Sequence, residues 1–365
     1  MTLDRWLTRT ILVCCFSILV LGLLIGDRGF AQSKQGLDPQ SKYHRGMRLA
    51  DQVLKNEALV VSDARAEHRT QIYSHGAPTE HSVLVLHGLH ASPHFMSGIS
   101  RTLFASGANV ISVRLPGHFE DVQKRIARVD FLEWVDAANK GFRIAKMLGT
   151  KVSVLGYSTG GTLAANLALT NPRDIHATVL IAPALAVSNQ VVLSSIALGW
   201  TGLTSNTFCG EDFLEDSRTC RFLKWMDDQI QDTTSHKMTS APGAGFEVQQ
   251  LIDWILVKEL NKVTGEPTME PSDYYENIRS VFGSIQTPVL MINSDSDTVV
   301  QPRLNREVYR RMRQRKAELY FQGSENIRHT VLASPADQAF PWDKTNGFNK
   351  KFDPMLDVIL KFIWQ

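Results

Sequence analysis

The chain has 365 residues, of which 43% are hydrophobic and 21% are charged, and its formal net charge is +2. This balance is that of an ordinary globular protein, and it excludes a strongly basic chain of the kind that binds nucleic acid. The length is sufficient for one large α/β domain with an insertion, or for two domains.

The N-terminal residues 1–31 differ from the rest of the chain. Arg5 and Arg9 precede an apolar run over residues 11–25, and Gly29 and Ala31 are small residues suitably placed for cleavage. This layout is typical of a secretory signal peptide, and the run is short for a membrane span of about 20 residues. We therefore predict a signal peptide or an uncleaved N-terminal anchor. The folded part is then exported, periplasmic or secreted, and an anchor would allow association with a membrane.

Residues 32–80 are predicted to be an N-terminal extension with the first strands. Residues 41–59 have the spacing of an amphipathic helix, and residues 69–88 indicate two strands joined by a turn that contains glycine and proline. Within the second of these strands, residues 83–86 are of the apolar, doubly buried type found in parallel sheets.

Strands and helices then alternate along two stretches, residues 81–186 and 285–365. Apolar strand patterns occur at residues 109–118, 152–157, 177–185, 287–295 and 316–324, and helical spacing occurs at residues 130–148 and 162–169. The alternation predicts a mostly parallel central sheet flanked by helices, formed from both stretches.

Between these two stretches, over residues 187–284, strands and helices no longer alternate. We interpret this segment as a helical lid insertion over the carboxyl edge of the sheet, where α/β proteins bind ligands. Its tryptophans, Trp200, Trp225 and Trp254, either form the core of the lid or line a substrate site. Cys209 and Cys220 are compatible with a local disulfide and equally with two free thiols.

Residues 303–316 are strongly basic. Leu304, Val308 and Met312 recur every four residues among the arginines. This spacing favours a helix with a buried apolar stripe and a solvated basic face; a membrane-binding face is the alternative.

The stretch at residues 156–160, Gly-Tyr-Ser-Thr-Gly, lies between an apolar strand and a helix. This is the context of a G-x-S-x-G nucleophile elbow with Ser158 as the nucleophile. The non-catalytic alternative is a structural turn in which the serine caps the helix. The spacing fits neither type of phosphate-binding glycine loop.

A serine nucleophile needs a base and a group that orients the base, and in this architecture the acid follows the serine and the histidine comes last. Asp295 and Asp297 follow one later strand, and His329, the last histidine, follows the final strand. An oxyanion hole would need two main-chain N–H groups, and Thr159 and Leu89 are placed to supply them. His87, His90 and His94 lie on a loop without acidic neighbours, which disfavours a metal site.

The motifs HGLHASPHFM, VRLPGH, GYSTGG, DSDTVV and NIRHTVL occur in the order that is typical of the α/β-hydrolase superfamily. Over about residues 80–365 the chain resembles bacterial carboxylesterases and monoacylglycerol lipases. The resemblance implies an eight-stranded sheet and no cofactor, and the ligand spacing above predicts no metal. It also implies Ser158 as nucleophile, His329 as base, Asp297 as the acid because a valine stands two residues after it, and Leu89 and Thr159 as the oxyanion hole. Phe119 departs from the Gly-His-Gly of relatives, so the shape of the pocket beside it does not follow from the resemblance.

The resulting hypothesis is an exported serine hydrolase that cleaves carboxylic esters with lipid-like acyl chains through an acyl-enzyme. Its expected partner is a small-molecule ester or lipid. Acyl transfer or thioester cleavage on the same triad is one alternative, and a non-catalytic binding protein that has retained the fold is another.

Overall fold

The computed structural model describes residues 38–89, 91–121, 125–186, 242–264, 273–329, 331–332 and 349–365. The chain divides into two units, residues 1–41 and 42–365. The predicted signal peptide or anchor, His90, both mature-chain cysteines and most of the predicted lid lie outside the described residues, so these assignments stay predictions. Among the described helices, none combines the length and the apolar character that crossing a membrane requires.

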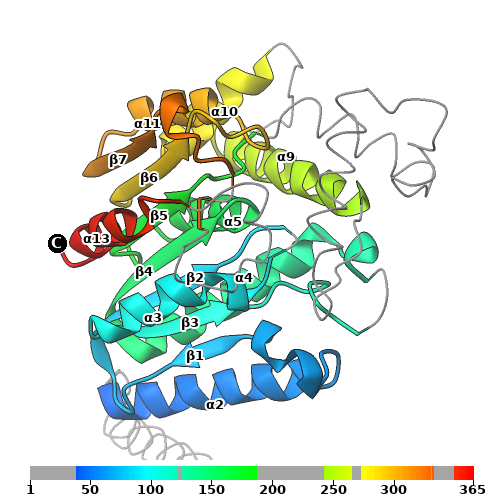
Figure 1. Ribbon diagram of the computed structural model, residues 1–365, viewed down its shortest axis with the longest axis vertical. Coiled ribbons are helices and arrows are strands. Elements are labelled where there is room, and N and C mark those ends of the chain that lie inside the picture. Colours follow the sequence, from blue (N-terminus) through cyan, green and yellow to red (C-terminus); the bar gives the residue numbers. More distant parts are fainter. Residues whose placement is uncertain are drawn as a thin grey trace, which may run out of the picture. The chain divides into compact units, whose positions relative to one another are not determined.

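The described residues form one seven-stranded sheet in the order β1-β3-β2-β4-β5-β6-β7 (Figure 1). Only β1 is antiparallel to its neighbour β3, and every other pair is parallel. The predicted mostly parallel sheet is therefore confirmed. The strands are β1 (Gln71–Tyr73), β2 (Thr79–Leu86), β3 (Asn109–Val113), β4 (Gly149–Tyr157), β5 (Ala177–Ile181), β6 (Val289–Ser294) and β7 (Lys316–Phe321).

Two details differ from the expected arrangement. The described part of the chain has seven strands, not the expected eight. The turn at Gly76 does join two strands, but they do not pair with each other, because β3 lies between β1 and β2.

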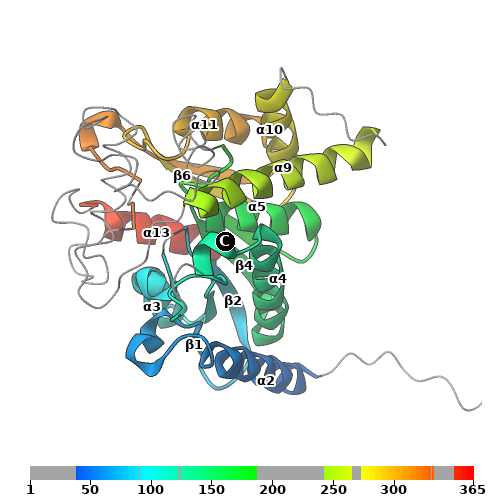
Figure 2. The same ribbon diagram turned by 90° about the vertical axis from the view of Figure 1, so that its right-hand side faces the viewer.

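Helices cover both faces of the sheet (Figure 2): α3 and α13 lie on one face, and α4, α5 and α9 lie on the other. This double coverage explains why β3, β5 and β6 are buried along their whole length. The helices are α2 (Pro39–Glu57), α3 (Ser97–Ala105), α4 (Phe131–Leu148), α5 (Thr159–Thr170), α9 (Pro242–Thr264), α10 (Tyr274–Gly283), α11 (Pro302–Arg311) and α13 (Phe352–Ile363). The short 3₁₀ segments are η1 (Asp63–His68), η2 (Pro93–Met96), η3 (Arg125–Arg128) and η5 (Gly323–Glu325).

Helix α4 shows how local sequence sets an element. Asp130 and Glu133 form a capping box at its start, and it ends at Gly149. Trp134 is fully buried, and its indole N–H donates to the carbonyl of Pro116 at 3.0 Å. Gly141 lets the helix approach the sheet, because an added Cβ would lie 2.5 Å from the Val113 side chain.

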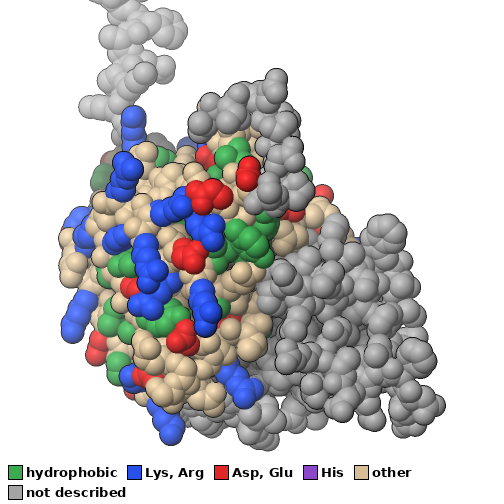
Figure 3. Space-filling view, turned by 90° about the horizontal axis from the view of Figure 1, so that it is seen from above, with side chains coloured by type: hydrophobic (Ala, Val, Ile, Leu, Met, Phe, Trp, Pro, Cys, Tyr) green, Lys and Arg blue, Asp and Glu red, His purple; other side chains and the backbone are tan. Residues whose placement is uncertain are grey.

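The predicted basic helix is α11. It buries Leu304 and Val308 and exposes Arg310 and Arg311. Figure 3 shows the face that carries α10 and α11, which lie at the top of Figure 1. On this face Lys and Arg side chains are interspersed with acidic ones. Arg311, for example, forms an ion pair with Glu276 on α10. The buried stripe and solvated basic face agree with the prediction, whereas membrane binding is not tested.

Within the predicted lid, the structure describes α9 and α10. Trp254 on α9 packs against the Phe131 ring at 5.9 Å, and the Lys258 ammonium lies 4.2 Å above the Trp254 ring. Lys258 also donates to the Asn166 side chain on α5. Trp254 is therefore part of the packing between α9 and α4.

Candidate active site

Ser158 lies at the sharp bend between β4 and α5. Its φ of 53° and ψ of −119° fall outside the helical region, and a positive φ is unusual for a residue with a side chain. Its N–H donates to the carbonyl of Ile181 at 2.9 Å, which ties the bend to β5. The strained turn predicted from the motif is confirmed.

Two glycines of the motif permit the close contacts that this bend requires. A Cβ on Gly156 would lie 2.1 Å from the carbonyl oxygen of Gly160. A Cβ on Gly160 would lie 2.3 Å from the carbonyl oxygen of Leu86 and 2.5 Å from that of His87. These atoms are backbone, so only a hydrogen fits at either position.

Gly160→Ala is therefore expected to lower the free energy of unfolding by about 3 kcal/mol or more, because the added methyl group must displace the backbone at the end of β2. Urea unfolding followed by circular dichroism measures the loss. Gly323→Ala is the matched control: its Cβ would lie 3.8 Å from the Asp295 Cβ, an ordinary contact. Equal stability of the two variants would contradict the steric interpretation.

His329 lies on the loop after η5 and faces the bend. Its Nε2 is 2.9 Å from the Ser158 hydroxyl oxygen, and its Nδ1 is 2.7 Å from Asp297 Oδ2. The structure thus brings together three side chains that stand 171 and 32 positions apart in the chain. All three are largely buried: the Asp297 side chain is 0% exposed and that of His329 12% exposed.

The structure distinguishes the two candidate acids. Asp297 directs Oδ2 at His329, while its Oδ1 accepts hydrogen bonds from the N–H groups of Val299 and Val300 at 2.9 and 3.1 Å. Asp295 instead accepts a hydrogen bond from the Tyr320 hydroxyl. Of the two candidate acids, Asp297 is therefore the one whose carboxylate contacts His329.

Tyr157 belongs to the site and was missed by sequence reasoning. Its hydroxyl donates to the main-chain carbonyl of His329 at 2.9 Å, and the two rings are 5.3 Å apart. Burial raises the pKa of the Tyr157 phenol, so it is a permanent donor. The available signal was a tyrosine at the end of a buried strand, where the hydroxyl needs a partner.

The loop after β2 passes directly beside the nucleophile. A Cβ on Gly88 would lie 2.9 Å from the Ser158 Cβ and 3.1 Å from the Tyr157 ring. Leu89 follows on this loop, and Thr159 begins α5, where the first main-chain N–H groups have no partner within the helix. Both predicted oxyanion-hole residues thus belong to segments that adjoin Ser158.

His87 has a structural role at the start of this loop. Its Nδ1 donates to the carbonyl of Gly88 at 2.8 Å, and its Nε2 accepts from the N–H of Leu115 at 2.9 Å. Burial lowers the pKa of His87 to about 3, so the imidazole is neutral. His94 lies on η2, with its ring 5.4 Å from that of His68. Among the described residues, no three potential metal-ligating side chains of His, Cys, Asp or Glu form a group that would hold an ion.

The depressed pKa of His87 predicts a pH-dependent stability. Above pH 6.5, the pKa of this histidine in the unfolded chain, neither the folded nor the unfolded protein carries the proton. Between pH 6.5 and about 3, only the unfolded chain binds it. Stability therefore falls as the pH drops through this window, by about 1.4 kcal/mol per pH unit. His87→Gln keeps an acceptor for Leu115 but removes the titration. The stability advantage of wild type over the variant in urea unfolding should shrink from pH 7 to pH 4, and a constant difference would contradict the assignment.

Phe119, the departure from the Gly-His-Gly pattern, has a φ of 55°, a conformation that favours glycine. Its ring stacks on that of His68 at 3.9 Å and lies 5.8 Å from Phe95 on η2. His68 in turn forms a hydrogen bond with Ser92. The phenylalanine is thus buried in a cluster that supports the loop after β2.

The fold and this arrangement of side chains define the chain as an α/β-hydrolase. It belongs to the family described as serine aminopeptidase, S33, whose model matches residues 77–335, more than half of the chain.

Individual relatives give a finer comparison. Over 133 residues the chain is 33% identical to a thermostable monoacylglycerol lipase of Bacillus sp. (strain H-257), a stretch that covers 36% of this chain and 48% of that lipase. The matched stretch thus spans about half of the lipase. Among solved structures, the metagenome-derived lipolytic enzymes LipS and LipT give a TM-score of 0.53 at 15% identity, covering 84% of this chain and 99% of that chain. The monoacylglycerol lipase of Paleococcus ferrophilus gives 0.52 at 17% identity, covering 80% and 97%. These structural similarities show the fold.

Proposed function

We propose that the protein is a serine hydrolase that cleaves carboxylic esters with lipid-like acyl chains. The observation that supports the proposal is the pair of hydrogen bonds that links Asp297 to His329 and His329 to Ser158. The partial likeness to a monoacylglycerol lipase supports an acyl ester over other acyl compounds. A retained fold without catalysis would not require all three side chains to be aligned.

In the proposed mechanism, Asp297 accepts the Nδ1 proton of His329 in a hydrogen bond, which leaves Nε2 free to accept the proton of the Ser158 hydroxyl. The serine oxygen attacks the ester carbonyl, and the main-chain N–H groups of Leu89 and Thr159 stabilise the oxyanion. His329 then protonates the leaving alcohol. A water molecule, deprotonated by His329, releases the acid from the serine.

Tyr157 contributes to this mechanism by position. Its hydrogen bond to the carbonyl of His329 links the histidine loop to the end of β4, one residue before the nucleophile. The base and the nucleophile are therefore held by the same strand end, which limits changes in the distance between Nε2 and the serine oxygen.

A fluorophosphonate probe and a substrate panel test the proposal. Mass spectrometry should locate the label on Ser158, and p-nitrophenyl esters of graded acyl length should be hydrolysed with a preference for longer chains. Amino-acid p-nitroanilides test the peptidase activity named in the family description. Faster cleavage of these amides, or acyl products formed on added alcohols in preference to water, would contradict ester hydrolysis as the principal reaction.

A further inference from the structure

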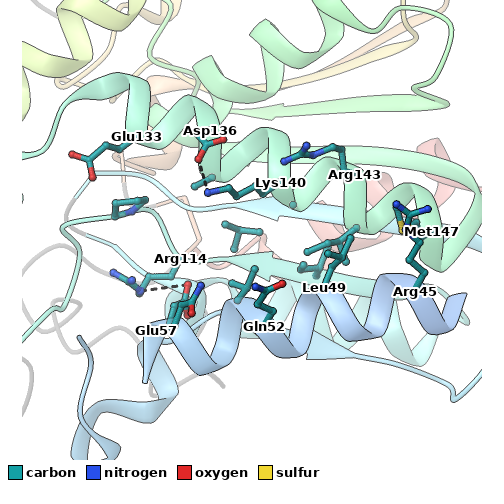
Figure 4. Close-up of a pocket in the computed structure, with 18 residues that line it drawn as sticks. Arg45, Leu49, Gln52, Glu57, Arg114, Glu133, Asp136, Lys140, Arg143 and Met147 are labelled. Carbon is teal, nitrogen blue, oxygen red and sulfur yellow. Dashed lines mark ion pairs between the residues drawn. The ribbon is translucent and has the colours of Figure 1, made fainter. Parts of the chain in front are cut away.

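A groove of about 710 Å³ lies between α2 and α4, over β3, and contains none of the three proposed catalytic side chains (Figure 4). This volume falls within the range of small-molecule sites. Helices α2 and α4 approach each other closely where Gly46 faces α4, since a Cβ there would lie 2.7 Å from the Met147 Cβ. The lining face of α2 extends from Arg45 to Glu57, about 18 Å at the helical rise per residue.

The lining between the two ends is mixed: Gln52 and the Lys140–Asp136 ion pair lie among several apolar side chains. Leu49 and Val53 line the groove from α2, and Ala137, Ile144 and Met147 line it from α4. Leu49 is 36% exposed and is among the few large hydrophobic side chains at the surface of the described residues. A long open groove with apolar side chains on both helices can hold an extended hydrocarbon chain.

The two ends of the groove differ in charge. At one end, Arg114 pairs with the buried carboxylates of Glu57 and Glu120, so its charge is already compensated. At the other end Arg45 lies beside Met147, and Arg143 lies on the α4 rim between Lys140 and Met147 (Figure 4). Within the described part of the chain, neither of these two arginines has a hydrogen-bond or ion-pair partner, whereas Lys140 on the same rim pairs with Asp136 at 2.6 Å.

From this polarity we propose that the groove is a second binding site, for a single-chain amphiphile with a carboxylate head. Arg45 and Arg143 bind the carboxylate, for which guanidinium groups are well suited, and the acyl chain lies along Leu49, Val53 and Met147. The site is separate from the Ser158 centre, so this inference does not depend on the proposed function.

Binding of laurate to the full chain carrying Ser158→Ala tests the proposal without turnover. A photoreactive diazirine analogue of laurate should label residues within 43–57 or 133–147. Arg45→Gln with Arg143→Gln should raise the Kd for laurate at least tenfold, because two charge-assisted hydrogen bonds are lost. Lys42→Gln with Arg48→Gln is the control, since it removes the same charge from exposed α2 positions that do not line the groove.

Labelling confined to other peptides, or an unchanged Kd in the Arg45/Arg143 variant, would overturn the proposal. So would equal binding of laurate and neutral dodecyl maltoside, or binding of an amphipathic helical peptide in place of laurate. Tighter binding of dodecyl phosphate would overturn the carboxylate assignment. Failure of the esterase assays would leave these results unaffected, which separates this inference from the proposed function.

Discussion

Ser158→Ala is expected to lower kcat/KM for a p-nitrophenyl ester by about 10⁶-fold. The alanine removes the oxygen proposed to form the acyl-enzyme, while the backbone bend and the glycine contacts around it should remain. A residual rate above that in water is expected, because the main-chain N–H groups still stabilise an oxyanion when water attacks. Steady-state kinetics at pH 8 measures the change, and labelling by fluorophosphonate should be lost.

Ser296→Ala is a suitable control for this experiment. Ser296 lies one residue before Asp297, and its hydroxyl donates only to the carbonyl of Gly323 at 3.3 Å. The variant should retain wild-type kinetics and labelling. If Ser158→Ala kept more than a small fraction of the activity while Ser296→Ala lost it, the assignment of the nucleophile would be wrong.

The sequence predicts the part of the site that depends on local pattern. Ser158 could be found because a strand, a tight turn and a helix occur within residues 152–169, and the turn leaves room only for small neighbours. His329 and an acid could be found from their order along the chain. The strands were recognisable because burial on both faces gives continuous apolar runs.

Other features depend on contacts between distant segments. No local pattern indicates that the Tyr157 hydroxyl bonds to His329, which is 172 positions away. Asp295 and Asp297 both follow β6, so the local sequence did not show which of them contacts His329, and only the resemblance favoured Asp297. In the structure the two differ because Asp295 accepts a hydrogen bond from Tyr320 on β7. The groove between α2 and α4 likewise depends on how two amphipathic helices are placed on the sheet.

The seven-stranded sheet illustrates a further limit. The order of strands follows from pairing over long separations, and β3 lies between β1 and β2 although it follows both in sequence. Alternating elements predict a parallel sheet, but they do not specify which edge receives the antiparallel strand.

Asp297→Asn is expected to lower kcat by about 10⁴-fold with little change in KM. The Asn oxygen can still accept from the N–H groups of Val299 and Val300, so the side chain keeps its orientation and presents its NH₂ group to His329. An NH₂ donor facing Nδ1 favours the tautomer with the proton on Nε2, which cannot accept the proton of Ser158. The fold and the ester-binding surface should be unaffected, which confines the loss to kcat.

Asp295→Asn supplies the matched comparison, because it makes the same chemical change two residues away on the same loop. An asparagine oxygen there still accepts from Tyr320, so kcat should stay close to that of wild type. The pair of variants separates the effect of lost charge near the site, common to both, from the effect on the histidine tautomer, confined to position 297. Equal losses in both variants would show that general electrostatics, not orientation of His329, underlies the dependence on Asp297.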